Sequence, residues 1–177
     1  MLAERAVFLR RARTRFAASS FVEYELLNID ADPRFQGFAL RQCDAIIATN
    51  VLHATPFLSN TLTNCERLLC AGGVLIVNEA LTTSAFLQIT FGMTDGWWLF
   101  SENCDPERVG QGSPLLSWRQ WQSLLADSGF VDSRSLRGDG ILSSQAVLIA
   151  QASARAAVCA MPAFDQGAHL LSGGLGG

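Results

Sequence analysis

Two side chains, His53 and Glu79, have the types expected of a general-base pair. A carboxylate that accepts the proton of one imidazole nitrogen holds the ring in one tautomer and makes the other nitrogen a better proton acceptor. The alternative is structural: His53 would bond a backbone carbonyl in a turn, and Glu79 would cap the following helix. Their spacing alone leaves both possibilities open.

The two residues follow two short apolar runs, which predict neighbouring strands. Residues 43–49 and 74–80 are rich in alanine, valine and isoleucine, as is typical of parallel strands that are covered on both faces. An amphipathic helix at 57–69 lies between them, which predicts a right-handed strand, helix, strand unit. Parallel strands end at the same rim of a sheet, where ligands of open α/β sheets bind. We therefore expect His53 and Glu79 on one rim.

Further elements are predicted on both sides of this unit. Ser117 is placed to cap a helix that Gly129 terminates. Five strand residues are expected to be buried, namely Cys43, Ile46, Ile47, Leu75 and Val77. The remaining predicted elements are a helix at 4–17 and strands at 21–29, 132–138 and 145–151.

Composition excludes several classes of protein. The chain has 177 residues, of which 49% are hydrophobic and 16% charged, as in a globular domain. A net charge of -3 gives no basic surface for nucleic acid or an anionic membrane. No apolar run is long enough to span a bilayer and the N-terminus is unlike a signal peptide, so we expect a cytoplasmic location.

The cysteines and histidines do not indicate a metal site. The chain has 5 cysteines and 2 histidines, without a CxxC pair or a cluster of ligands. We expect no bound metal and no disulfide framework. The cysteines are interpreted as reduced thiols of the core or the surface: Cys43, Cys65, Cys70, Cys104 and Cys159.

Four consecutive segments resemble a known family. They read "NVLHAT", "LLCAGGVLIVNE", "FGMTDGWWLF" and "GSPLLSWRQWQSLLADSGF". In this order they are similar to motifs of the C-methyltransferase domain of reducing polyketide synthases, which is a class I S-adenosylmethionine-dependent enzyme. The similarity extends over about residues 5–152, and the paired tryptophans followed by "GSPLLS" make it specific. The resemblance implies an α/β fold with a Rossmann-like class I methyltransferase sheet.

The resemblance also implies a reaction. In the family a histidine and a glutamate are thought to deprotonate the α-carbon of a β-ketoacyl thioester on an acyl carrier protein, and His53 and Glu79 stand at those positions. Two alternatives remain open: a non-catalytic structural pseudo-methyltransferase module of a polyketide synthase, and a small-molecule O- or N-methyltransferase. The missing cofactor loop favours the first alternative, and the paired tryptophans argue against the second.

The cofactor site implied by the resemblance is incomplete. The family holds S-adenosylmethionine with a glycine-rich loop and an acidic residue after the first two strands, and neither motif is present, so we expect a sheet that lacks these two strands. Asn28 stands where an aspartate usually contacts adenine, and an amide loses the charge of a carboxylate. Asn50, at a strand end, is expected near the methionine part of the cofactor, and Asp30 is expected in a turn. Without the two strands, residues 22–28 should pair with 44–49 or stay loosely attached with the N-terminal helix.

Substrate contacts are expected in the irregular region 81–116. Trp97 and Trp98 suit either the core or a lid over the acyl chain. Arg108 is a candidate for contact with the phosphopantetheine arm of the acyl carrier protein, with a solvated loop arginine as the alternative.

The implied domain organisation has three parts. Residues 1–152 are a partial methyltransferase domain, and 153–167 are a linker. Residues 168–177 resemble the start of a ketoreductase-like Rossmann domain, with a strand and a glycine-rich turn. The expected partners are therefore the carrier protein and neighbouring polyketide synthase domains.

Overall fold

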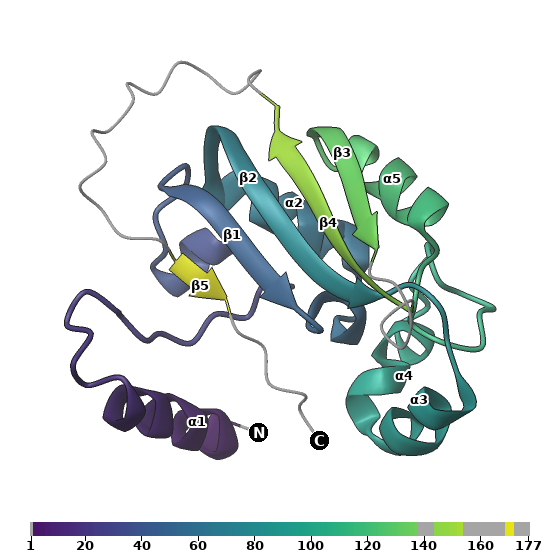
Figure 1. The fold of residues 1–177 in the computed structure, drawn as a ribbon, viewed down its shortest axis with the longest axis horizontal. Coiled ribbons are helices and arrows are strands. Elements are labelled where there is room, and N and C mark those ends of the chain that lie inside the picture. The colour runs from purple at the N-terminus through teal and green to yellow at the C-terminus, as the bar shows by residue number, and fades with distance from the viewer. Residues whose placement is uncertain (1, 138–143, 154–168, 172–177) are drawn as a thin grey trace.

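The fold is a mixed five-stranded sheet with order β3-β4-β2-β1-β5, and two helices, α2 and α5, lie on one of its faces (Figure 1). This computed structural model describes residues 2–137, 144–153 and 169–171. The strands are β1 (Cys43–Thr49), β2 (Leu69–Ala80), β3 (Phe130–Arg137), β4 (Gln145–Ala152) and β5 (His169–Leu171). The α-helices are α1 (Leu2–Arg15), α2 (Leu58–Leu68), α3 (Ala85–Thr90), α4 (Asp95–Glu102) and α5 (Trp118–Asp127), and the 3-10 helices are η1 (Pro33–Gln36), η2 (Leu52–Ala54) and η3 (Phe91–Met93).

The predicted strand, helix, strand unit is confirmed. Strands β1 and β2 are parallel neighbours, with Ile46 opposite Leu75 and Thr49 opposite Asn78. Helix α2 connects them and packs on the sheet through side chains that are fully buried, including Leu58, Leu62 and Cys65. Strand β2 begins earlier than expected, and a register irregularity between Cys43 and Ala45 accommodates the extra residues.

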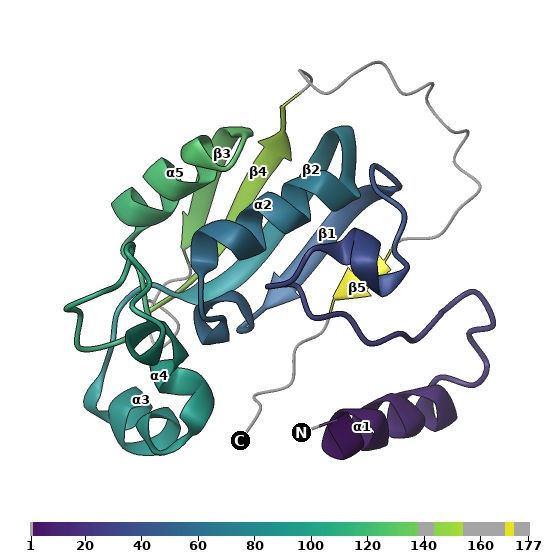
Figure 2. The same cartoon turned by 180° about the vertical axis from the view of Figure 1, so that it is seen from behind.

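The prediction of five buried strand residues is correct for four of them. Cys43, Ile46, Leu75 and Val77 are buried, whereas Ile47 is 37% exposed. Successive side chains of a strand point to opposite faces, so Ile47 points away from α2. Figure 2 shows α2 and α5 on the same face, and in the described part of the chain no helix covers the other one.

Helix α5 begins after Ser117 and ends before Gly129, as predicted. The Ser117 side chain accepts a hydrogen bond from the Gln120 amide, and the Gln120 side chain accepts one from the Ser117 amide, which completes a capping box. Gly129 follows with φ of +91° and turns the chain into β3. Strands β3 and β4 pair antiparallel, close to the predicted 132–138 and 145–151.

The prediction of a strand at 21–29 is wrong. Residues 22–28 have no regular secondary structure. The backbone groups of a strand form hydrogen bonds with a neighbouring strand. Here side chains donate hydrogen bonds to backbone carbonyls of this segment instead. Arg13 donates to the Tyr24 carbonyl at 2.7 Å, and the Asn64 amide donates to the Ile29 carbonyl at 2.8 Å. Helix α1, close to the predicted 4–17, lies apart from the sheet (Figures 1 and 2).

The edge of β1 is occupied by a segment from the other end of the chain. Strand β5 pairs in parallel with β1, with Ile46 opposite His169 and Ala48 opposite Leu171. The expected pairing of 22–28 with 44–49 is therefore not formed, because another extended segment satisfies this edge. The assignment of 168–177 to a ketoreductase-like domain stays a prediction, and most of these residues and of the expected linker lie outside the described part.

Four cysteines in the described part are free thiols, as expected, and Cys159 lies outside it. Burial raises the pKa of Cys43 to about 11 and that of Cys65 to about 12. Cys104 is exposed. No helix in the described residues is long and apolar enough to cross a membrane.

We expect the cysteines to differ in reactivity with iodoacetamide at mildly alkaline pH. Only the thiolate reacts, so among the four described cysteines the exposed Cys104 should be alkylated first and Cys65 more than about 100-fold more slowly, since each unit by which burial raises the pKa of Cys65 costs roughly tenfold in thiolate. Peptide mass spectrometry at timed intervals measures the order. The same reaction in concentrated urea is the control, in which the difference should vanish; early alkylation of Cys65 in the folded chain would contradict the packing of α2.

Candidate active site

His53 and Glu79 meet at the carboxyl ends of β1 and β2, on the one rim expected. His53 Nδ1 lies 2.7 Å from Glu79 Oε2, and the two residues are 6% and 1% exposed. A carboxylate that accepts a hydrogen bond from Nδ1 holds the ring in the tautomer whose Nε2 is the free acceptor. The arrangement is that of an oriented general base.

The second oxygen of Glu79 organises the backbone that carries the histidine. Oε1 accepts hydrogen bonds from the amides of Val51 at 2.9 Å and Leu52 at 2.8 Å, with that of His53 at 3.4 Å. These amides open the short helix η2, whose first amides have no partners within the helix. Glu79 thus caps η2 across the sheet and orients the imidazole at the same time.

An aromatic wall closes one side of the imidazole. Trp97 on α4 is 3% exposed and contacts the His53 ring in a T-shaped arrangement, with centroids 5.7 Å apart. Phe91 stacks on Trp97 with centroids 6.1 Å apart, and Gln88 accepts a hydrogen bond from the indole at 3.1 Å. The wall makes the surroundings of the base apolar and holds it in place.

The region expected to be irregular is partly helical. Residues 85–102 form α3, η3 and α4, which lie beyond the carboxyl ends of β1 and β2 (Figure 1). Trp98 is half-buried, and its indole donates to the Gly92 carbonyl at 2.8 Å. Trp97 and Trp98 are therefore both packed within this helical region, and their contact with substrate stays a prediction.

Arg108 lies in the interior and not at a surface. It is 0% exposed, as is Asp105, whose Oδ2 accepts from Arg108 Nε at 2.5 Å. Arg108 Nη1 donates to the His53 carbonyl at 2.7 Å, and Nη2 donates to that of Thr55 at 2.6 Å. Burial lowers the pKa of Arg108, and the Asp105 carboxylate opposes this effect. The expected contact with a phosphopantetheine arm needs an accessible guanidinium, so this placement argues against it.

The two asparagines expected at the cofactor differ in their surroundings. Asn50 directly follows β1, with φ of +49°, and is half-buried. Its side-chain amide has no hydrogen-bond partner among the described residues. Asn28 is exposed, and its Oδ1 accepts from the Asp30 amide at 3.3 Å in a local turn. No hydrogen bond in the described part joins either asparagine to the other or to the dyad.

Two carboxylates near the site were not identified as partners from the sequence. Asp105 pairs with Arg108, and Asp30, although it lies in a turn as expected, also accepts from the Phe57 amide at 3.4 Å where α2 begins. Burial raises the pKa of Asp30, and the bond from Phe57 opposes the increase. Aspartates in loops are common, and no sequence signal distinguishes these two before the chain is folded.

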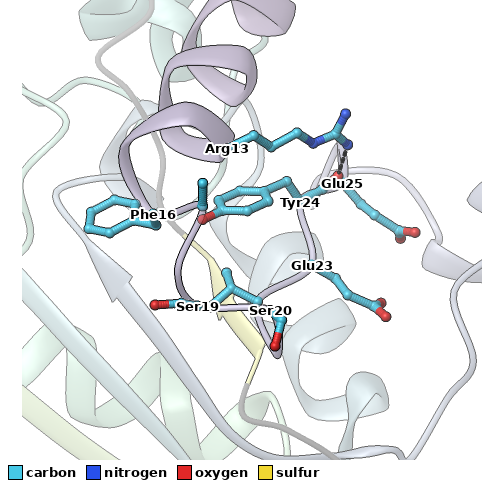
Figure 3. A pocket seen from close by; sticks show the side chains of 9 residues that line it. Arg13, Phe16, Ser19, Ser20, Glu23, Tyr24 and Glu25 are labelled. Carbon is cyan, nitrogen blue, oxygen red and sulfur yellow. Dashed lines mark hydrogen bonds between the residues drawn. The ribbon is translucent and has the colours of Figure 1, made fainter.

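A concave region beside α1 is a separate feature. Figure 3 shows this pocket of about 510 Å³, between α1 and residues 19–25. Arg13 donates to the Tyr24 carbonyl, while the Tyr24 hydroxyl has no hydrogen-bond partner among the described residues. The pocket brings no imidazole or thiol beside a carboxylate, so it offers no comparable base. Among the described residues no group of histidine, cysteine, aspartate and glutamate could hold a metal ion.

We expect Glu79→Ala to lower the free energy of unfolding by about 2–4 kcal/mol, because it leaves buried amides and the imidazole without an acceptor. Glu79→Gln should be milder, because the amide oxygen still accepts. Urea denaturation measures both. Glu107→Ala, at an exposed position near the same site, is the control and should change stability by less than about 0.5 kcal/mol. Equal effects of Glu79→Ala and Glu107→Ala would contradict the bonds described.

Comparisons with known proteins show which family this chain resembles. The sequence model of the family described as "Methyltransferase domain" matches residues 5–77. The polyketide synthase ThaG of Burkholderia thailandensis is 40% identical over 126 residues, which are 71% of this chain and 2% of that protein. The lovastatin diketide synthase lovF of Aspergillus terreus is 42% identical over 126 residues, or 71% of this chain and 5% of that protein.

Solved structures of carbon methyltransferases have the same fold. The CurJ carbon methyltransferase has a TM-score of 0.74 and 38% identity, over 84% of this chain and 39% of that one. The trans-methyltransferase CalH, solved with SAH, has a TM-score of 0.74 and 32% identity, over 83% of this chain and 40% of that one. The chain thus spans about two fifths of the solved relatives and a small part of the curated ones. It belongs to the family of C-methyltransferase domains of polyketide synthases.

Proposed function

We propose that this chain carries the base of an S-adenosylmethionine-dependent C-methylation of the α-carbon of a β-ketoacyl thioester on an acyl carrier protein. The observation that carries the proposal is the 2.7 Å contact between His53 Nδ1 and Glu79 Oε2, buried at the rim where α/β sheets bind ligands. The sequence identity of 40–42% with polyketide synthases supports a carrier-bound β-ketoacyl thioester as the substrate. Neighbouring domains of such a synthase are the proposed partners.

The residues divide the work between proton transfer and orientation. Glu79 keeps the proton on Nδ1, so His53 Nε2 is free to remove the α-proton, which is acidic because a ketone and a thioester flank the carbon. The electron pair left on that carbon is the nucleophile, and its alignment with the methyl group contributes much of the rate. Trp97 restricts the ring to one orientation. S-adenosylmethionine, when bound, supplies an electrophilic methyl group on a sulfonium and needs no metal.

The described residues fit this cofactor in part. Asn50 presents an unpartnered, half-buried amide beside the dyad at the end of β1, which suits the polar amino acid end of the cofactor. Asn28 would contact adenine only if its side chain leaves the turn with Asp30. The chain therefore supplies more of the residues proposed for proton transfer than of those proposed for cofactor binding. This is in line with the proposal that its cofactor site is incomplete.

The structural alternative, a pseudo-methyltransferase module, predicts no use for an oriented base. The 2.7 Å contact between His53 Nδ1 and Glu79 Oε2 supports the catalytic proposal over this alternative. An O- or N-methyltransferase would also accept a base here, so the methylated atom has to be identified in the assay.

We expect His53→Ala to reduce methylation of a β-ketoacyl carrier by at least about 10²-fold, because general bases contribute about 10²–10⁴. The affinity for S-adenosylmethionine should change little, since the histidine is assigned to proton transfer. Glu79→Gln should be milder, with Glu107→Gln as its matched control. The assay uses this chain joined to the segments that complete the cofactor site in its relatives, and mass spectrometry locates the methyl group. Substantial activity of His53→Ala would point to another base.

The chain by itself should not bind S-adenosylhomocysteine in the micromolar range. Each missing hydrogen bond is worth about 1 kcal/mol, so the loss of a backbone cradle and a ribose anchor amounts to several kcal/mol. Calorimetric titration of the purified chain measures this. Clear micromolar binding would show that other residues build the site and would refute the proposed inactivity of the isolated chain.

A further inference from the structure

Arg108 binds carbonyls of the same turn whose amides bind Glu79. Its Nη1 and Nη2 donate to the carbonyls of His53 and Thr55, and Nη2 also reaches that of Pro56 at 3.3 Å. Glu79 meanwhile accepts from the amides at the start of the same turn. The backbone around His53 is thus held at its amides by a carboxylate and at its carbonyls by a guanidinium.

The guanidinium itself is held rigidly. Asp105 Oδ2 accepts from Nε, and Phe100 lies under the guanidinium with its ring centroid 5.4 Å from Cζ. Arg108 and Asp105 are both 0% exposed. A planar donor group whose counter-charge, aromatic neighbour and carbonyl acceptors are all buried has little freedom to move.

The charged groups that face Arg108 come from three parts of the fold. Asp105 belongs to the same segment as Arg108, Glu79 lies near the end of β2, and Asp30 precedes η1. All three carboxylates act electrostatically on Arg108. A lysine has the same charge but lacks the fork that reaches two carbonyls and a carboxylate together. The substitution Arg108→Lys therefore keeps the charge and removes the forked shape, so the two effects can be measured separately.

We propose that Arg108, held by Asp105, is a positioning residue for His53: it sets the direction of the imidazole so that Nδ1 meets Glu79 and Nε2 faces the substrate. This inference rests on the proposed function of His53 as the base. It replaces the surface role expected of Arg108 with a role that acts through the turn between β1 and α2. The pair does not touch substrate in this assignment.

The test reads the tautomer of His53 directly and needs no substrate. The chain has 2 histidines, so His169→Gln leaves His53 as the only one. Nitrogen-15 NMR of the labelled ring, at a pH where it is neutral, distinguishes a protonated Nδ1 from a protonated Nε2. We expect the Nδ1-protonated form in the His169→Gln protein and a mixture of both forms, in comparable amounts, after Arg108→Lys.

Arg119→Lys is the matched control, because Arg119 is an exposed arginine of α5, and it should leave the tautomer unchanged. A folded Arg108→Lys protein with the Nδ1-protonated form alone would overturn the positioning role. If Arg108 served stability alone, Arg108→Lys would lower the melting temperature and leave the Nδ1-protonated form unchanged.

Asp105→Asn provides a second variant in case the lysine protein does not fold, and it should also give a mixture because the guanidinium loses its anchor. Loss of the far-ultraviolet circular dichroism in both variants would overturn the proposal, since the pair would then serve the fold and not the orientation. An Nε2-protonated ring in the His169→Gln protein itself would instead contradict the proposed function, so the two failures are distinguishable.

Discussion

The Glu79 carboxylate accepts hydrogen bonds from successive backbone amides and from the His53 ring, and the position of this one group follows from the register of the sheet. Thr49, the last residue of β1, lies opposite Asn78, so Glu79 is the first residue of β2 beyond the pairing with β1. On its other side β2 stays paired with β4, where Glu79 lies opposite Ala146. The carboxylate is therefore held by a strand and faces the amides that β1 leaves at its end.

The sheet has two different faces, and this difference determines where chemistry is possible. Helices α2 and α5 cover one face, and Leu75, Val77 and Glu79 point toward it because they alternate along β2. The Glu79 side chain thus lies in the interior, at the end of the row that Leu75 and Val77 begin, where α3 and α4 lie near the sheet. Trp97 packs against the His53 ring at this end, so the dyad is sheltered by aromatic groups.

Periodicity was sufficient to predict the elements that make local or buried contacts. The strands β1 and β2, the helix between them and the Ser117 cap follow from apolar patterns and from side chains that bond their own neighbours. The strand predicted at 21–29 was wrong because alternation says nothing about the availability of a partner, and β5 came from more than a hundred residues away. Ile47 was predicted to be buried for a similar reason, since the pattern of a strand does not tell whether both of its faces are covered.

The dyad was predicted from the topology and from the family resemblance, but its supports were not. The contact between Arg108 and the turn of His53 spans 55 residues, and no local pattern marks an arginine as buried when arginines are usually solvated. Asp105 was overlooked for the same reason. Long-range polar contacts depend on the fold as a whole, so a sequence indicates which residue types are present and not which carbonyls they reach.

The buried polar groups around His53 are difficult to explain by stability alone. Replacing a buried ion pair with apolar residues of similar volume is often neutral or stabilising, because charges are costly to remove from water. Here Glu79, Asp105 and Arg108 are all almost inaccessible. Glu79 and Arg108 bind groups of the same short turn, and Asp105 binds Arg108. A fold that needed only a closed core could fill this space with apolar side chains. The polar groups instead converge on one imidazole, and this convergence, more than the presence of any single residue, supports the proposal that His53 is the base.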